Sequence, residues 1–287
     1  MKLLKIIVIP AIVCFFSLTL LQAQDLQTPM PSPTGTITQL VGLTEVSISY
    51  SRPGVKGREI FGNLVPYGEL WRTGANKSTT ISFSKEVKLE GKYVAAGEYA
   101  LFTIPGKQDW TVIISKDIGS GTSKYKMEDD VLRFKVMPRS LPEPVERLTF
   151  EIADITDESA RIVLRWASTE ISFALTADTE NQVMAQIDEI MDNEELKDAN
   201  AFFRAAEYYF SNDKDTDQAQ EWITRAVELN PDAFWMLRLK SRIEAKQGDY
   251  KKAIETAQLS LKAAEKAGNQ QYVQYNQEAI AEWQTKL

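Results

Sequence analysis

The residue types that most often carry out chemistry in proteins are nearly absent from this chain. None of the 287 residues is histidine, and the single cysteine, Cys14, lies in an apolar stretch near the N-terminus. These absences exclude Ser-His-Asp and Cys-His nucleophiles, zinc sites built on imidazole or thiolate, and haem held by His or Cys. Carboxylate, lysine, tyrosine and hydroxyl chemistry remain. We therefore expect no metal, no cofactor and, on balance, no enzymatic activity.

The densest group of candidate binding residues lies in residues 50–80, which are rich in Gly, Pro, Arg and aromatic side chains. Long irregular loops in compact domains are usually functional or disordered, and the aromatic residues argue against disorder. Guanidinium groups beside an aromatic ring suit a carboxylate, a phosphate or a sugar. The candidate ligand-binding residues of the 52–79 loop are Arg52, Arg58, Trp71, Arg72 and Asn76.

Two other interpretations of this loop stay open. In one, the arginines pair with Glu59, Glu69 and backbone carbonyls to brace the loop, and Trp71 is its hydrophobic plug. In the other, Glu59 and Glu69 act in a carboxylate-dependent hydrolase or carbohydrate-active protein of the envelope, because glycoside hydrolysis needs only two carboxylates at a set separation.

The N-terminus predicts export. Two lysines precede an apolar run over residues 6–21, which Pro10 interrupts and which is too short for a membrane span. This is the layout of a secretory signal peptide over residues 1–23, with cleavage after Ala23. We expect a periplasmic or secreted protein that has no membrane span after cleavage and folds without disulfides.

The hydrophobic period is two over residues 36–176, which follow a Pro-rich lead-in at residues 24–35. Such alternation buries one face of each strand, and many short strands without long helical patterns are typical of an antiparallel β-sandwich. We therefore predict an all-β antiparallel sandwich domain. Its apolar runs include residues 46–50, 81–83, 110–114, 148–152, 162–166 and 171–175.

Three parts of this half resemble one known family. They are the stretch 50–80, the segment 97–106 and Trp110. Over residues 33–175 the chain is similar to DUF2911, a bacterial envelope family of β-rich domains of unknown function. The resemblance implies a β-rich fold and an envelope location, and it brings no activity with it.

From residue 179 the period of the apolar residues becomes that of a helix. The segments 226–231 and 246–254 resemble the tetratricopeptide repeat, whose period is 34 residues and whose small residues let paired helices pack closely. Residues that recur at this spacing are Asp215 and Asp249, Ala219 and Ala253, and Ala226 and Ser260.

This resemblance predicts an all-α helical repeat domain over residues 179–287, with clear units at 200–233 and 234–267. Two repeats are fewer than such stacks normally need. The helix before the repeats, at 179–192, and the helix after them, at 269–283, would therefore have to cap them.

In the tetratricopeptide pattern, certain positions of the first helix of each pair line a concave groove. The resemblance places Arg204, Trp235, Arg238 and Arg242 there. Residues 176–287 are otherwise acidic, with 13 basic and 21 acidic side chains, so a basic groove favours a carboxylate-bearing peptide. The alternative is a solvated face on which Glu207 and Glu244 pair with the arginines.

Neither half has the clustered positive face of a nucleic-acid binder. We therefore predict an exported, non-enzymatic binding or scaffolding protein of the cell envelope. In this interpretation the sandwich binds an anionic or sugar ligand through the 52–79 loop, and the repeats bind a protein or peptide partner.

Overall fold

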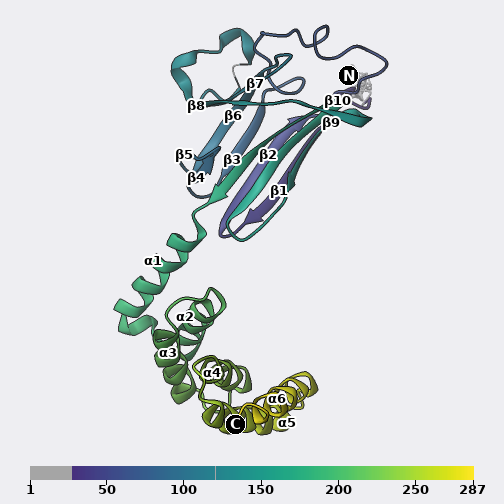
Figure 1. The fold of residues 1–287 in the computed structure, drawn as a ribbon. Coiled ribbons are helices and arrows are strands. Elements are labelled where there is room, and N and C mark those ends of the chain that lie inside the picture. The colour runs from purple at the N-terminus through teal and green to yellow at the C-terminus, as the bar shows by residue number, and fades with distance from the viewer. Residues whose placement is uncertain (1–27, 120) are drawn as a thin grey trace, which may run out of the picture.

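The predicted fold class is confirmed by a computed structural model of the chain, which describes residues 28–119 and 121–287. The predicted signal peptide lies outside the described residues. An antiparallel β domain is followed by six α-helices, which extend away from one end of the β domain (Figure 1). No helix in the described ranges is both long and apolar enough to cross a bilayer.

Two sheets face each other across the main hydrophobic core of the β domain. All strand pairs are antiparallel, and the buried faces carry large side chains such as Ile48, Trp110 and Trp166. The larger sheet has the order β1 (Thr34–Val41), β2 (Thr44–Ser51), β3 (Thr79–Phe83), β6 (Gly97–Ile104), β7 (Trp110–Ser115) and β8 (Asp130–Val136). The smaller sheet has the order β5 (Lys92–Val94), β4 (Val87–Leu89), β10 (Ser159–Ala177) and β9 (Arg139–Ala153).

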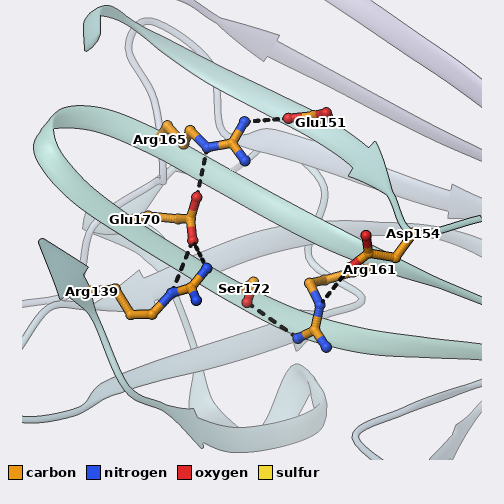
Figure 2. A network of polar contacts seen from close by, with 7 residues as sticks. All are labelled: Arg139, Glu151, Asp154, Arg161, Arg165, Glu170 and Ser172. Atoms are coloured by element: carbon orange, nitrogen blue, oxygen red, sulfur yellow. Dashed lines mark hydrogen bonds and ion pairs between the residues drawn. The ribbon is translucent and has the colours of Figure 1, made fainter. Parts of the chain in front are cut away.

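Strand β10 doubles back on itself near Ala167, whose φ is 50°. The Arg161 guanidinium donates to the Ser172 hydroxyl at 3.4 Å although 11 positions separate the two residues. A strand advances about 3.3 Å per residue, so these side chains can meet only if the strand reverses between them. Figure 2 shows the ribbon turning back between Arg165 and Glu170. The first arm of β10 therefore pairs with β9, and the second arm pairs with the start of β9 at Thr169 and Glu170 and with β4 at its end.

A charged network joins the two arms of β10 to β9 (Figure 2). Glu170 is only 4% exposed and accepts hydrogen bonds from Arg139 at 3.1 Å and from Arg165 at 2.6 Å. Arg165 also pairs with Glu151. Burial alone would raise the pKa of the Glu170 carboxyl, but the hydrogen bonds and charges of the two arginines outweigh burial and hold that pKa below its ordinary value.

We expect Glu170→Gln to lower the free energy of unfolding by about 1–3 kcal/mol at neutral pH, because charge-assisted hydrogen bonds are lost. Since the folded-state pKa of Glu170 is lowered, its stabilisation is present above the ordinary carboxyl pKa of 4.5. The stabilisation is lost as the pH falls through the folded-state value. Urea melts of the wild type and the variant should therefore converge in acid.

The exposed Glu143 on β9 provides the matched control. Glu143→Gln should leave the free energy of unfolding within about 0.5 kcal/mol of the wild type. A Glu170→Gln effect that stays constant from neutral pH into acid would contradict the contribution of the carboxylate.

The six helices are stabilised by caps and small residues that recur with the repeat. Asp215 and Asp249 accept backbone N–H groups at the starts of α3 and α5, so these acidic residues act as N-caps. Ala219 and Ala253 are fully buried where paired helices meet. The helices are α1 (Thr179–Asp192), α2 (Ala199–Ser211), α3 (Thr216–Leu229), α4 (Phe234–Lys246), α5 (Tyr250–Lys266) and α6 (Gln270–Gln284).

Helices α1 and α6 lie at the two ends of the stack. Met191 at the end of α1 packs on the core formed by α2, α3 and α4. Trp283 of α6 is buried against Ala253 and Ala257 of α5. Both helices thus cover apolar surface that the two repeats would otherwise expose.

The β domain and the helices are joined by a single residue, Asp178, between β10 and α1. The Thr179 hydroxyl donates to the Asp157 carbonyl at 2.6 Å. Gly42, in the turn between β1 and β2, has a φ of 55°, and a Cβ there would lie 1.9 Å from the Thr179 hydroxyl oxygen and 2.3 Å from the Asp157 carbonyl oxygen. Two turns of the sandwich therefore hold the first residue of α1.

Candidate functional site

The 52–79 loop is packed onto the sandwich. The C-terminal part of the loop joins the larger sheet at Trp71, which exchanges two backbone hydrogen bonds with Thr103 of β6. Further back, Val65 and Ile60 are buried in the core. The loop is therefore an ordered part of the domain, as its aromatic content predicts.

Trp71 is the hydrophobic plug of this loop. It is 9% exposed, and its indole Nε1–H donates to the Gly74 carbonyl at 3.1 Å. Its ring stacks on Trp166 with centroids 5.7 Å apart and lies edge-on to Phe61 and Trp110. Four aromatic rings thus close one end of the sandwich core.

The three candidate arginines of the loop donate to neutral oxygens. Arg52 donates to the Leu148 carbonyl and the Thr149 hydroxyl of β9, and Arg58 donates to the Val55 and Gly54 carbonyls. Arg72 donates to the Asn76 carbonyl at 2.7 Å. These bonds brace the loop through carbonyls. Within the described ranges, no carboxylate lies within ion-pair distance of the three arginines.

Four of the five candidate residues border one hollow of ≈ 360 Å³. Arg58, Arg72 and Asn76 line it together with the buried Trp71 and with Trp166. The fifth candidate, Arg52, does not line the hollow because its guanidinium is bound to β9. The carboxylates proposed for the hydrolase alternative, Glu59 and Glu69, are both exposed, and neither lines the hollow.

A second hollow, of ≈ 400 Å³, lies on the face formed by α2, α4 and α6. Arg238 and Arg242 project into it from α4, beside Lys246 and Lys286. Aromatic rings complete the surface, with the Arg242 guanidinium 4.8 Å from the Phe210 ring centroid. We call this surface the basic groove.

The two arginines of the basic groove form no ion pair with the residues that the structure describes, although Glu278 attracts Arg238 from a greater distance. Lys246 pairs with Asp213 and Lys286 with Glu282, whereas no carboxylate in the described ranges lies within ion-pair distance of either arginine. Burial, followed by the like charge of Arg242, lowers the pKa of Arg238. Instead of pairing with a carboxylate, the Arg238 guanidinium donates to the Tyr275 carbonyl at 3.1 Å. It also lies over the Tyr275 ring, 4.7 Å from the ring centroid.

The other predicted groove residues lie elsewhere. Arg204 is exposed on α2 and Trp235 packs partly buried against the helical core, and neither lines the basic groove. Glu244 is buried and pairs with Lys240, so it does not neutralise Arg238 or Arg242. The i, i+4 spacing places Arg238 and Arg242 on one face of α4, and both line this hollow, whereas Phe210 of α2 and Lys286 just after α6 come from segments that are distant in sequence.

No metal site is evident in residues 28–119 and 121–287, where no three Asp, Glu, His or Cys side chains group as ligands. Two acidic residues between α2 and α3 have other partners: Asp213 pairs with Lys246, and Asp215 caps α3.

The fold is an antiparallel β-sandwich followed by a helical domain, and one of the hollows described above lies on each of the two parts. Over residues 32–175, about half of the chain, the sequence matches the family described as "Protein of unknown function (DUF2911)". The chain belongs to this family, as the resemblance over residues 33–175 predicted.

Among solved structures, the tetratricopeptide repeat domain protein Q2S6C5_SALRD of Salinibacter ruber is similar at 18% identity. That match covers 30% of this chain and 97% of the other chain, with a TM-score of 0.29. No curated protein matches the chain.

Proposed function

We propose that this protein is an exported, non-enzymatic binding protein whose basic groove holds an acidic segment of a partner protein. The signal-peptide pattern of residues 1–23 supports export. N-terminal sequencing of the mature protein from the host envelope tests it, and a start at Gln24 is expected.

The observation that carries the groove proposal is that Arg238 and Arg242 form no ion pair with the described residues. The guanidinium group of arginine binds a carboxylate through two parallel hydrogen bonds, and the aromatic rings beside the two arginines give apolar contact to the rest of a peptide. In a half of the molecule with an excess of acidic residues, the groove keeps two arginines without a carboxylate within ion-pair distance. A carboxylate-bearing segment supplies the missing charge.

Fluorescence polarisation with labelled Glu/Asp-rich decapeptides tests this assignment, with Lys/Arg-rich decapeptides as the reversed-charge comparison. We expect the mature chain to bind only the acidic set, and Arg238→Glu or Arg242→Glu to weaken binding by at least about tenfold. Both variants should melt within a few degrees of the wild type, because partly exposed helix positions tolerate substitution.

Arg225 provides the control, since it is an exposed helical arginine that pairs with Glu228 outside the groove. Arg225→Glu should leave peptide binding unchanged. Equal binding of acidic and basic peptides, or full binding by both groove variants, would contradict the proposal.

A further inference from the structure

We propose that the hollow beside residues 72–76 binds an oxyanion, the carboxylate or phosphate group of a small molecule. This inference goes beyond the basic groove and rests on different residues. The hollow measures ≈ 360 Å³, and Arg58 and Arg72 border it while no acidic side chain does. The charged side chains that line this hollow are therefore both positive.

Both arginines keep donors available for a ligand. A guanidinium has five N–H donors. Arg72 uses one of its nitrogens on the Asn76 carbonyl, and Arg58 uses two of its nitrogens on the Val55 and Gly54 carbonyls. These bonds fix where each guanidinium stands, so its remaining donors are held in place before a ligand arrives.

Trp166 carries a further donor. Trp166 lines the hollow, is 1% exposed, and its Nε1–H has no acceptor among the described residues. A buried N–H without an acceptor is rare in native proteins because it costs about 1–3 kcal/mol. An oxygen atom of a ligand seated on this indole would supply the acceptor.

The backbone of residues 72–76 includes one strained residue, Thr73. Thr73 is β-branched and fully buried, yet its φ is 54°, and Asn76 has a φ of 59°. Positive φ at a β-branched residue is uncommon and clusters at ligand-binding sites, where the surrounding structure enforces it. Here the Thr79 hydroxyl donates to the Thr73 carbonyl at 2.7 Å, and the hydroxyl groups of Thr73 and Thr103 lie 3.1 Å apart.

The same geometry favours an oxyanion over a neutral sugar. Sugar sites usually offer an open aromatic face, but Trp71 and Trp166 stack on each other and are 9% and 1% exposed. Neither ring has a free face for a sugar. The arginines and the unpaired indole N–H offer donors only, which is what an oxyanion accepts.

Isothermal titration of the mature chain at constant ionic strength tests the site with three probes: inorganic phosphate, acetate and glucose. We expect saturable one-to-one binding of phosphate or acetate, and no binding of glucose. Tighter phosphate binding assigns the site to phosphate groups, and tighter acetate binding assigns it to carboxylates. Glucose binding, or the absence of saturable anion binding, overturns the proposal.

Variants locate the binding. The double substitution Arg58→Gln and Arg72→Gln should weaken anion binding by at least tenfold, whereas Arg147→Gln should not. Arg147 is the matched control because it is exposed and also donates to a loop carbonyl, that of Arg52, but lies outside the hollow. Unchanged binding by a folded double variant overturns the proposal.

A nuclear magnetic resonance readout on the wild type keeps the test decisive if the double variant does not fold. The indole N–H signal of Trp166, assigned with Trp166→Phe, should move downfield as the anion saturates. A Trp166 signal that stays unchanged at saturation overturns the proposed seat of the anion on this indole.

Discussion

Replacing Trp71 by alanine should lower the free energy of unfolding by about 3–5 kcal/mol, measured by chemical denaturation. The indole is 9% exposed and contacts the rings of Phe61, Trp110 and Trp166 in the core. Its removal leaves a cavity under the whole loop and also removes the Nε1–H bond to Gly74. We expect this to be the largest single effect among substitutions in the loop.

Tyr67 gives the comparison for this prediction, because it is an aromatic residue of the same loop but is 40% exposed. Tyr67→Ala should cost less than about 1 kcal/mol. If Trp71→Ala were as mild as Tyr67→Ala, the loop would not depend on its plug and the hollow above it would lack a fixed floor.

The second large effect is expected at Gly42, where the turn between β1 and β2 meets the start of α1. Gly42→Ala places a Cβ 1.9 Å from the Thr179 hydroxyl oxygen and 2.3 Å from the Asp157 carbonyl oxygen, so backbone must move. The left-handed φ of 55° adds about 1–2 kcal/mol for any residue with a Cβ, and overpacking adds about 1–3 kcal/mol. Thermal and urea melts should both show this loss of stability.

Gly91 separates the two contributions, since its φ is 76° and a Cβ there would meet nothing within 4 Å. Gly91→Ala should therefore lower the free energy of unfolding only through the left-handed backbone conformation, without a contribution from overpacking. Equal effects of the two substitutions would show that the contact of Gly42 with α1 contributes nothing to stability.

The strands could be predicted because burial follows the sequence directly. The apolar runs 162–166 and 171–175 differ in phase, and these are the two arms of β10 on either side of Ala167. Strand order could not be predicted, because it depends on which distant strands meet. Strands β4 and β5 have three residues each, too few for a periodic pattern to stand out.

The helical half shows which residues around the basic groove local spacing can relate to one another and which it cannot. Arg238 and Arg242 are neighbours on one helix, so local spacing was enough to pair them. Phe210 and Lys286 join them only because the helices stack, which no local pattern records. In the sandwich, Glu170 and Arg139 are 31 residues apart, and Trp166 meets the loop only through the folded core.

The connection through Asp178 has a consequence for how two bound molecules are held. Domains joined by a flexible linker meet at an effective concentration that depends on linker length. Here one residue separates β10 from α1, Gly42 and Asp157 hold Thr179, and Lys214 of the first repeat pairs with Glu180 of α1. A ligand bound to the sandwich and a peptide segment bound in the basic groove would thus be kept at a set distance from each other.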